Sequence, residues 1–157
     1  MTEVVPAEHS DREGVRALLL EAGLPLDGLL EVPTTVFVAR DHGRVMGAVA
    51  LERHGEDGLL RSLVVDPGRR GERLGSALAD AAEREASRLG LGAVYLLTET
   101  AALFFAARGF EMVDRADAPA AIVGSIEWSV ACAETAEAMV KHVARSPLSV
   151  PGAATPP

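Results

Sequence analysis

The residues best suited to chemistry lie in the segment 59–78, where an apolar run is followed by a turn and by the start of an amphipathic helix. The turn contains Pro67 and Gly68, and within five residues it holds three arginines: Arg69, Arg70 and Arg73. A tight turn that leads into a helix directs backbone N–H groups outward, and the helix adds the positive end of its dipole. This combination predicts a site for a phosphate diester, against the alternative of a solvated basic turn.

The residues around the turn predict a strand, a long helix and a second strand. Residues 59–65 are mostly apolar, and residues 70–89 repeat apolar or small side chains at helical spacing up to Gly90. Residues 93–97 are apolar on both faces, which is typical of a central strand that is covered on both sides. Because strand–helix–strand crossovers are right-handed, the two strands should be parallel.

The rest of the chain supplies further elements on both sides of this unit. The elements expected before it are an edge strand at Val4 and Val5, a helix from Ser10 or Asp11 to about Ala22, a short helical turn at 26–30, strands at 34–40 and 45–51, and turns at 41–43 and 56–58. The elements expected after it are a helix at 100–108, a strand at 110–114, a helix at 118–130 and a strand at 136–143. This order predicts a single-domain α/β (α+β) fold, with helices flanking a mixed, mostly antiparallel sheet.

Length and composition restrict the class of protein. The chain has 157 residues, is 48% hydrophobic and carries a formal net charge of −8. These values predict one globular domain at residues 1–144, and the four prolines of residues 145–157 predict a disordered tail. The acidic balance argues against nucleic acid or an anionic membrane as the partner.

The single cysteine, the lack of a long apolar run and the N-terminal residues point to a cytoplasmic protein. Cys132 is the one cysteine, which excludes an intramolecular disulfide. No apolar run approaches the roughly 20 residues of a membrane span, and the N-terminus lacks the features of a signal peptide. No metal site is expected, because the histidines lack metal-ligand spacing: His9, His42, His54 and His142.

Two motifs resemble the GNAT superfamily of acetyl-CoA-dependent N-acetyltransferases. The first is Leu63-Val64-Val65-Asp66-Pro67 followed by Arg70-Gly71-Glu72-Arg73-Leu74-Gly75 and Leu78, similar to the family's strand, Arg-Gly-x-Gly-x-Gly loop and helix. The second is Ala101, Phe104, Phe105 and Gly109-Phe110, similar to the signature Asn-x-x-Ala-x-x-Leu-Tyr-x-x-x-Gly-Phe, with Thr98 at the Asn position. The resemblance covers residues 1–115.

The resemblance implies acetyl-CoA as cosubstrate and a small-molecule amine as partner, bound where two central strands splay apart. The residues it implies for acetyl-CoA are Leu63, Val64, Val65, Arg70, Gly71, Glu72, Arg73, Leu74, Gly75, Ser76, Thr98, Phe104 and Phe105. In the family, a backbone N–H on the strand before the loop meets the thioester carbonyl. Here that group falls near Val65.

Three positions depart from the family pattern. Arg73 replaces the central glycine of the loop, which tolerates unusual dihedral angles; its guanidinium could instead reach the phosphates, and we expect binding to be retained. Phe105 replaces the tyrosine that often protonates the leaving thiolate, and Leu59 stands where many members place a glutamate base. Transfer remains feasible, because positioning supplies much of the acceleration and a thiolate leaves without an acid.

The candidate catalytic residues must lie near the two splayed strands. Glu99 follows the second strand, and we expect it to act as a base through a water molecule. Arg61 interrupts an apolar strand, so it is either a member of a buried ion pair or a clamp for a substrate carboxylate. Asp57 and Glu127 are further carboxylates, and for each candidate carboxylate the alternative is a solvated surface group.

Within the superfamily, the chain is similar to the ArsN-type proteins of arsenic resistance. The residues behind this similarity are Leu60 to Leu63, Leu96 to Ala101, Ala118 to Ile122, Ser125, Glu127, Trp128 and Cys132. The similarity implies an amino-acid-like or organoarsenical amine as acceptor. Many small GNAT proteins dimerise, and the apolar C-terminal helix and last strand offer a surface for a homodimer.

Three functions are compatible with these residues. The leading hypothesis is an N-acetyltransferase that moves the acetyl group of acetyl-CoA to a small amine by direct attack. The second is a catalytically silent acyl-CoA-binding or sensor module, favoured by Leu59, Arg73 and Phe105. The third, a dinucleotide-binding protein, is disfavoured because the loop is not Gly-x-Gly-x-x-Gly and no acidic residue closes a following strand at the position that this motif requires.

Overall fold

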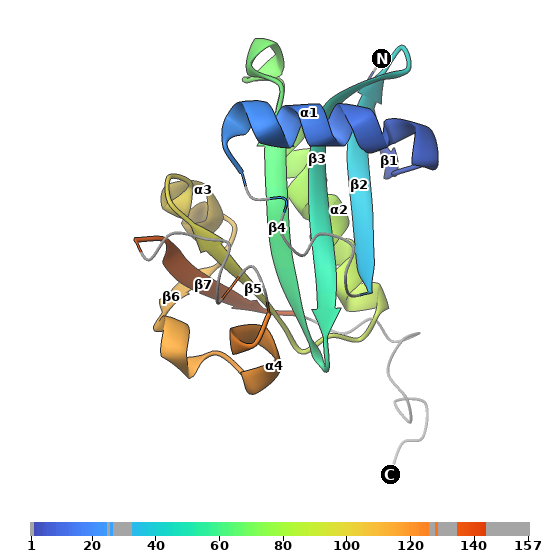
Figure 1. Cartoon of the computed structure of the whole chain (residues 1–157). Helices are drawn as coiled ribbons and strands as arrows, with labels where there is room; N and C mark the ends of the chain where they lie inside the picture. Colours follow the sequence, from blue (N-terminus) through green and yellow to red (C-terminus); the bar gives the residue numbers. More distant parts are fainter. Residues whose placement is uncertain (1, 25, 27–32, 126–127, 129–134, 144–157) are drawn as a thin grey trace.

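The computed structural model describes residues 2–24, 26, 33–125, 128 and 135–143 of the chain. Its framework is a seven-stranded sheet with the strand order β1-β2-β3-β4-β5-β7-β6 (Figure 1). The strands are β1 (Glu3–Pro6), β2 (Thr34–Asp41), β3 (Arg44–His54), β4 (Asp57–Val65), β5 (Ala93–Thr98), β6 (Glu111–Val113) and β7 (Glu137–His142). The described helices are α1 (Arg12–Ala22), α2 (Leu74–Arg88), α3 (Ala102–Ala107) and α4 (Ala120–Val123).

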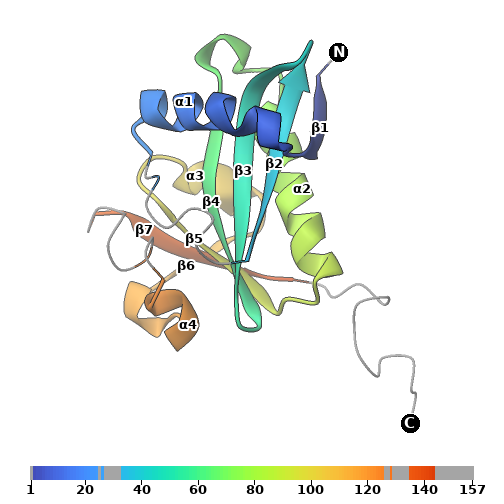
Figure 2. The same cartoon turned by 45° about the vertical axis from the view of Figure 1, so that its right-hand side comes forward.

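The sheet is mixed and splits near its middle. Strands β1 to β4 form an antiparallel meander, and the helix α2 crosses over to β5, which runs parallel to β4. The parallel pairing joins only Gly58 to Val94 and Leu59 to Tyr95, after which β4 and β5 diverge (Figures 1 and 2). Strand β5 continues its pairing with β7 instead, along its whole length. The predicted mixed, mostly antiparallel sheet with a splayed central pair is confirmed.

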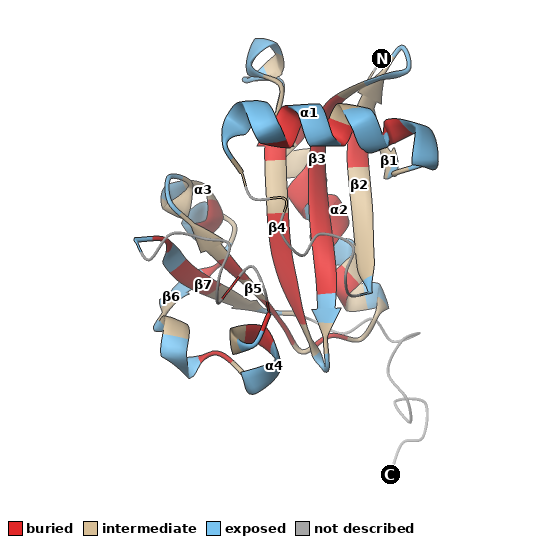
Figure 3. Ribbon diagram, viewed as in Figure 1, coloured by how far each residue is buried: buried red, intermediate tan, exposed pale blue. Residues whose placement is uncertain are grey.

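Helices cover both faces of the sheet. The helix α2 packs its Leu78, Ala82 and Ala86 against one face of the meander, where the buried strand residues include Val49 and Leu51. On the other face, α1 packs over the end of β4 and α4 packs over its beginning. Strands β3 and β4 are therefore buried along most of their length (Figure 3), and they form a rigid base for the residues that follow β4.

Turn chemistry sets the boundaries of the first helix and the first hairpin. Gly23 ends α1 in the left-handed conformation (φ 70°), and the N–H of the next residue, Leu24, donates to Leu19 O at 2.9 Å. His42 and Gly43 both have positive φ, which suits the two-residue turn between β2 and β3. The next turn begins at Gly55 (φ 67°), earlier than predicted, so β3 extends to His54 and β4 starts at Asp57.

Two helices differ from the sequence-based predictions. The helix expected from residue 70 begins at Leu74, because Arg73 is left-handed and residues 70–73 belong to the turn. The helix expected at residues 118–130 is the short α4, which Gly124 ends; residues 126–127 and 129–130 lie outside the described residues. The short helical turn expected at 26–30 lies outside them too, except for Leu26, and so does the expected tail at 145–157. No described helix is long and apolar enough to cross a membrane.

Candidate functional site

A cavity of about 470 Å³ opens at the end of β4, beyond the residues of β4 that pair with β5. It is bounded by the last residues of β4, the turn that follows, the first turn of α2 and the beginning of α3. Its lining residues are Leu63, Val64, Val65, Arg69, Arg70, Gly71, Arg73, Leu74, Gly75, Ser76, Ala101 and Phe104. The cavity thus has an apolar floor from β4 and α3 and a basic rim from the turn.

The first turn of α2 presents unpaired backbone donors to the cavity. The first intrahelical bond runs from Ala77 N to Arg73 O at 3.1 Å, so helix geometry leaves the N–H groups of residues 74–76 without an intrahelical acceptor. The residue at the cap position, Arg73, offers no side-chain acceptor to them. Three N–H groups and the positive end of a helix of 15 residues therefore lie at the cavity wall, an arrangement that binds phosphate.

The three arginines of the turn have different surroundings. Arg69 forms ion pairs with Asp41 on β2 and, at 3.0 Å, with Glu72, so it fastens the turn to the first hairpin. The hydrogen bond from Arg69 lowers the pKa of the Asp41 carboxyl. Arg70 and Arg73 are exposed, and neither makes a salt bridge or side-chain hydrogen bond with another residue of the described chain. Two cationic side chains are therefore free to meet an anion at the cavity.

Arg73 keeps the backbone conformation that glycine adopts most easily. Its φ and ψ are 61° and 23°, which is the left-handed region. For a residue with a Cβ this conformation costs about 1–2 kcal/mol. The substitution of arginine at the glycine position therefore leaves the loop open and adds a charge to its rim.

The end of β4 directs backbone groups toward the splay. The N–H of Asp66 donates to Met46 O on β3 at 2.7 Å. Because successive strand residues direct their N–H groups to opposite edges, the N–H of Val65 faces the β5 side. Strand β5 pairs with β4 only at Gly58 and Leu59, so no ladder bond from β5 occupies the Val65 N–H.

The segment between β5 and α3 closes the other side of the cavity. Thr98 Oγ1 accepts a hydrogen bond from Ala101 N at 2.9 Å and so shapes the start of α3. The Phe104 ring lines the cavity and lies close to Gly75, whose added Cβ would be 3.8 Å from it. Phe105 points the other way into the core, where its ring contacts Phe104 and Phe110 edge-on.

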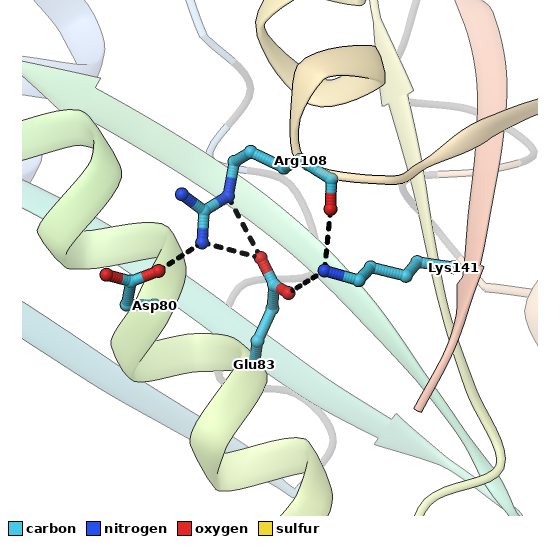
Figure 4. A network of polar contacts seen from close by, with 4 residues as sticks. All are labelled: Asp80, Glu83, Arg108 and Lys141. Atoms are coloured by element: carbon cyan, nitrogen blue, oxygen red, sulfur yellow. Dashed lines mark hydrogen bonds and ion pairs between the residues drawn. The ribbon is translucent and has the colours of Figure 1, made fainter. Parts of the chain in front are cut away.

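A polar network fastens α3 to α2 and β7 (Figure 4). Arg108, directly after α3, donates to Glu83 at 2.8 and 3.0 Å and forms an ion pair with Asp80. Lys141 on β7 donates to Glu83 at 2.5 Å and to the Arg108 carbonyl at 2.6 Å. The Arg108 guanidinium also lies 5.9 Å from the centroid of the Phe104 ring. The network therefore supports one wall of the cavity.

The structure brings together most of the residues predicted to bind the cofactor. All of them line the cavity except Glu72, which pairs with Arg69, Thr98, which accepts a hydrogen bond from Ala101 N before α3, and Phe105, which is in the core. Arg69 and Ala101 line it in addition. Ala101 belongs to the second motif and Arg69 to the arginine-rich turn, but only the fold shows that both line the cavity.

The predicted catalytic side chains do not line the cavity. Glu99 is exposed after β5 and lies 3.5 Å from Thr135 Oγ1. Arg61 is buried and pairs with Glu52 at 3.1 Å, so the structure shows the first of the two alternatives for this residue. Asp57 lies at the start of β4, where burial raises the pKa of its carboxyl. Glu127 lies outside the described residues.

Glu52 is a functional candidate that the sequence did not indicate. It faces Leu59 across the β3–β4 pair and is 2% exposed, with His54 Nε2 at 2.8 Å from its Oε1. Nothing in the sequence indicates it, because the predicted strand ends at Leu51 and Glu52 falls directly after it, whereas β3 extends to His54. Among the described residues, no three His, Cys, Asp or Glu side chains gather as metal ligands.

Comparisons with known proteins agree with this geometry. The chain is similar to a GNAT-family acetyltransferase of Staphylococcus aureus Mu50, with 17% identity over 92% of this chain and 100% of that one and a TM-score of 0.76. It is similar to Rv2747 of Mycobacterium tuberculosis, crystallised with CoA, with 23% identity over 90% and 99% of the chains and a TM-score of 0.77.

A third similar structure is N-acetylglutamate synthase of Neisseria gonorrhoeae in complex with coenzyme A and N-acetyl-glutamate, with 19% identity and a TM-score of 0.77. It is matched over 92% of this chain and 36% of that one. A search among curated proteins found no match. The similarity to ArsN-type proteins is untested by these comparisons and stays a prediction.

The family model of the acetyltransferase (GNAT) domain matches residues 33–112, from the beginning of β2 to β6. This span contains the whole cavity, both sequence motifs and the splayed strand pair. The chain therefore belongs to the GNAT family of acetyltransferases.

Proposed function

We propose that this protein transfers the acetyl group of acetyl-CoA to the amine of a small molecule by direct attack. The observation that carries the proposal is the cavity itself, where unpaired N–H groups of α2 and two unpaired arginines meet an apolar floor. CoA matches these two parts of the cavity, because it carries an anionic diphosphate beside a largely apolar arm. Membership of the family supports acetyl-CoA as the cosubstrate.

The diphosphate would lie against the first turn of α2. The N–H groups of Leu74, Gly75 and Ser76 are the donors without intrahelical acceptors, and they supply short, directional contacts. Arg70 and Arg73 add charge and bidentate geometry from the rim. Together these groups account for binding an anion on a protein whose net charge is −8.

The acetyl end would lie between β4 and α3. The thioester carbonyl accepts a hydrogen bond from the Val65 N–H, which faces the splay, and the same donor stabilises the oxyanion that develops during attack. The amine nitrogen forms a bond to the carbonyl carbon, and the carbon–sulfur bond breaks with the electron pair on sulfur. The amine loses its proton to water or to a base, for which we retain Glu99, acting through water from its exposed position.

The leaving thiolate departs without the usual acid. Phe105 carries no hydroxyl and lies in the core, so this position supplies no proton. A thiol has a pKa of about 8.5, so the thiolate is a tolerable leaving group near neutral pH. Holding the two reactants in position supplies the larger part of the acceleration.

We further propose an amino-acid-like or organoarsenical amine as the acceptor. This rests on the ArsN-type similarity in the sequence. The similar synthase from Neisseria, which was crystallised with an acetylated amino acid, is consistent with the first of these classes.

Release of free CoA thiol tests the transfer. Acetyl-CoA is incubated with the protein and a panel of amino acids, polyamines and organoarsenical amines, and thiol is measured over time. We expect release that depends on one class of amine and a product whose mass is increased by one acetyl group. No release above the no-enzyme control for any amine would contradict transfer.

A catalytically silent acyl-CoA-binding module is the second candidate. It is favoured by Leu59, which is fully buried where many relatives place a base, and by the core position of Phe105. In that case calorimetry shows CoA binding while no amine gives thiol release. Measurable turnover with any acceptor removes this candidate.

A further inference from the structure

Strands β3 and β4 hold a buried cluster of charged and titratable side chains, in the part of β4 that precedes the cavity. Glu52 Oε2 accepts a hydrogen bond from Arg61 Nη1 at 3.1 Å, and Glu52 Oε1 lies 2.8 Å from His54 Nε2. The exposed fractions of these side chains are 3% for Glu52, 0% for Arg61 and 9% for His54. A guanidinium with no exposure does not reach a ligand in the cavity, so any effect on the reaction passes through its neighbours.

One of those neighbours is Ser62, which has an unusual backbone. Arg61 Nε donates to Ser62 Oγ at 3.2 Å, and Ser62 is left-handed with φ 61°. The pairing with β3 shifts at this point, since Ala48 faces Val64 whereas Ala50 faces Arg61. Two residues of β4 therefore stand opposite one of β3, which is a β-bulge. Bulges redirect the strand that contains them.

The bulge comes directly before the residues that line the cavity. Leu63, Val64 and Val65 follow it, and Val65 carries the N–H that faces the splay. Without the bulge, the N–H group of each of these residues would point to the opposite edge of β4, because the N–H direction alternates from residue to residue. The conformation of Ser62 therefore decides which N–H groups face the cofactor.

We propose that Glu52 and Arg61 are positioning residues: through the bond to Ser62 Oγ they hold the bulge and thereby aim the Val65 N–H at the thioester carbonyl. This inference rests on the function proposed above. A serine at positive φ carries a cost that glycine does not, so a contact outside the backbone must offset it. Glu52 fixes the guanidinium, and the planar fork of arginine serves Glu52 and Ser62 together.

Two substitutions at one position separate positioning from other roles. Ser62→Ala removes the acceptor and keeps the cost of positive φ, whereas Ser62→Gly removes both. The readout is the ¹⁵N–¹H shift of the Val65 amide in complexes with acetyl-CoA and with CoA, because only the thioester offers a carbonyl. Calorimetry gives the dissociation constant of CoA for each variant. Ser10→Ala, at an exposed serine before α1 and outside the sheet, is the matched control.

In the wild type and in Ser10→Ala, we expect the Val65 amide to differ between the two complexes. In Ser62→Ala the difference falls by at least half, while Ser62→Gly restores most of it and CoA affinity stays within twofold in all four proteins. Wild-type behaviour of Ser62→Ala, or equal losses in Ser62→Ala and Ser62→Gly, would overturn the positioning role and leave the proposed function intact. Absence of CoA binding by the wild type would overturn the proposed function first and this inference with it.

Discussion

At the scale of single residues, Arg73 combines two effects that a substitution can separate. Its left-handed backbone costs about 1–2 kcal/mol, and its guanidinium stands at the rim of the cavity. Arg73→Gly should raise the free energy of unfolding by about 1 kcal/mol and weaken CoA binding several-fold, because it removes both the backbone cost and the charge. Chemical denaturation and calorimetry measure the two quantities.

Arg73→Ala is the matched control, since it removes the charge and keeps the backbone cost. It should weaken CoA binding as much as Arg73→Gly does without gaining stability. If Arg73→Gly bound CoA as tightly as the wild type, Arg73 would have no contact with the cofactor.

A substitution at Gly75 should also change protein stability and CoA binding in different directions. A Cβ at this position would be 3.8 Å from Phe104 and 3.9 Å from Val65, both at ordinary contact distance. Gly75→Ala should therefore keep or raise helix stability, by up to about 1 kcal/mol. The same Cβ enters the space between two cavity-lining side chains, so we expect CoA affinity to fall at least tenfold. Unchanged affinity would show that the cofactor arm does not pass between Val65 and Phe104.

At the scale of elements, the wall of the cavity depends on how α3 is fastened to α2. Glu83 accepts hydrogen bonds from both Arg108 and Lys141 (Figure 4). Glu83→Gln removes the charge from this half-buried network, and we expect a loss of about 1–2 kcal/mol in the free energy of unfolding and weaker CoA binding. Glu111→Gln, the same change at an exposed position on β6, should leave both unchanged. Equal stability of the two variants would show that the network does not hold α3.

The start of α1 is fastened to β2 in a pH-dependent way. The buried Asp11 carboxylate accepts hydrogen bonds from Arg40 at 2.6 and 3.2 Å, and these bonds lower the pKa of Asp11. The native state therefore favours the charged form, and the stability from this pair is complete above the unfolded pKa of about 4 and is lost as pH falls through the lower native value. Asp11→Asn should cost about 1–3 kcal/mol at neutral pH and approach the wild type in acid. A penalty that did not shrink in acid would contradict this assignment.

The sequence predicts the strands and helices better than the turns and bulges that change the direction of the chain. Apolar spacing and the glycines after α1 and α3 place most strands and helices within a few residues. The helix α2 starts later than its pattern indicates, because the left-handed turn at Arg73 has no signature in side-chain type. The bulge at Ser62 is equally hard to predict, because Arg61 and Ser62 interrupt the apolar run of residues 59–65 but their side-chain types do not indicate a shift in register.

At the scale of the whole molecule, one part of the candidate site could be predicted from the sequence and another part could not. The cofactor side is local in sequence, because one strand, one turn and one helix supply nearly all of it, and it could be predicted from the two motifs. The pair Glu52–Arg61 joins two strands and depends on their register, so sequence reasoning found Arg61 without its partner. The homodimer expected from the apolar C-terminal region stays a prediction, which light scattering can test.

The fold also explains how an acidic protein can receive an anionic cofactor. The net charge is −8, yet the turn between β4 and α2 concentrates arginines and helix N–H groups at one opening. The arginines and N–H groups attract the cofactor at distances of a few ångströms. Salt screens its repulsion by distant carboxylates over a length of about 8 Å. Binding is therefore decided at the opening and not by the total charge.

Calorimetric titration of CoA into the full chain tests the central claim most directly. We expect saturable binding of one CoA per chain, weakened several-fold in Arg73→Ala, whose circular dichroism should match that of the wild type. Absence of heat from a wild-type protein shown to be folded, or equal affinity of the two proteins, would contradict binding of the diphosphate at the β4–α2 turn.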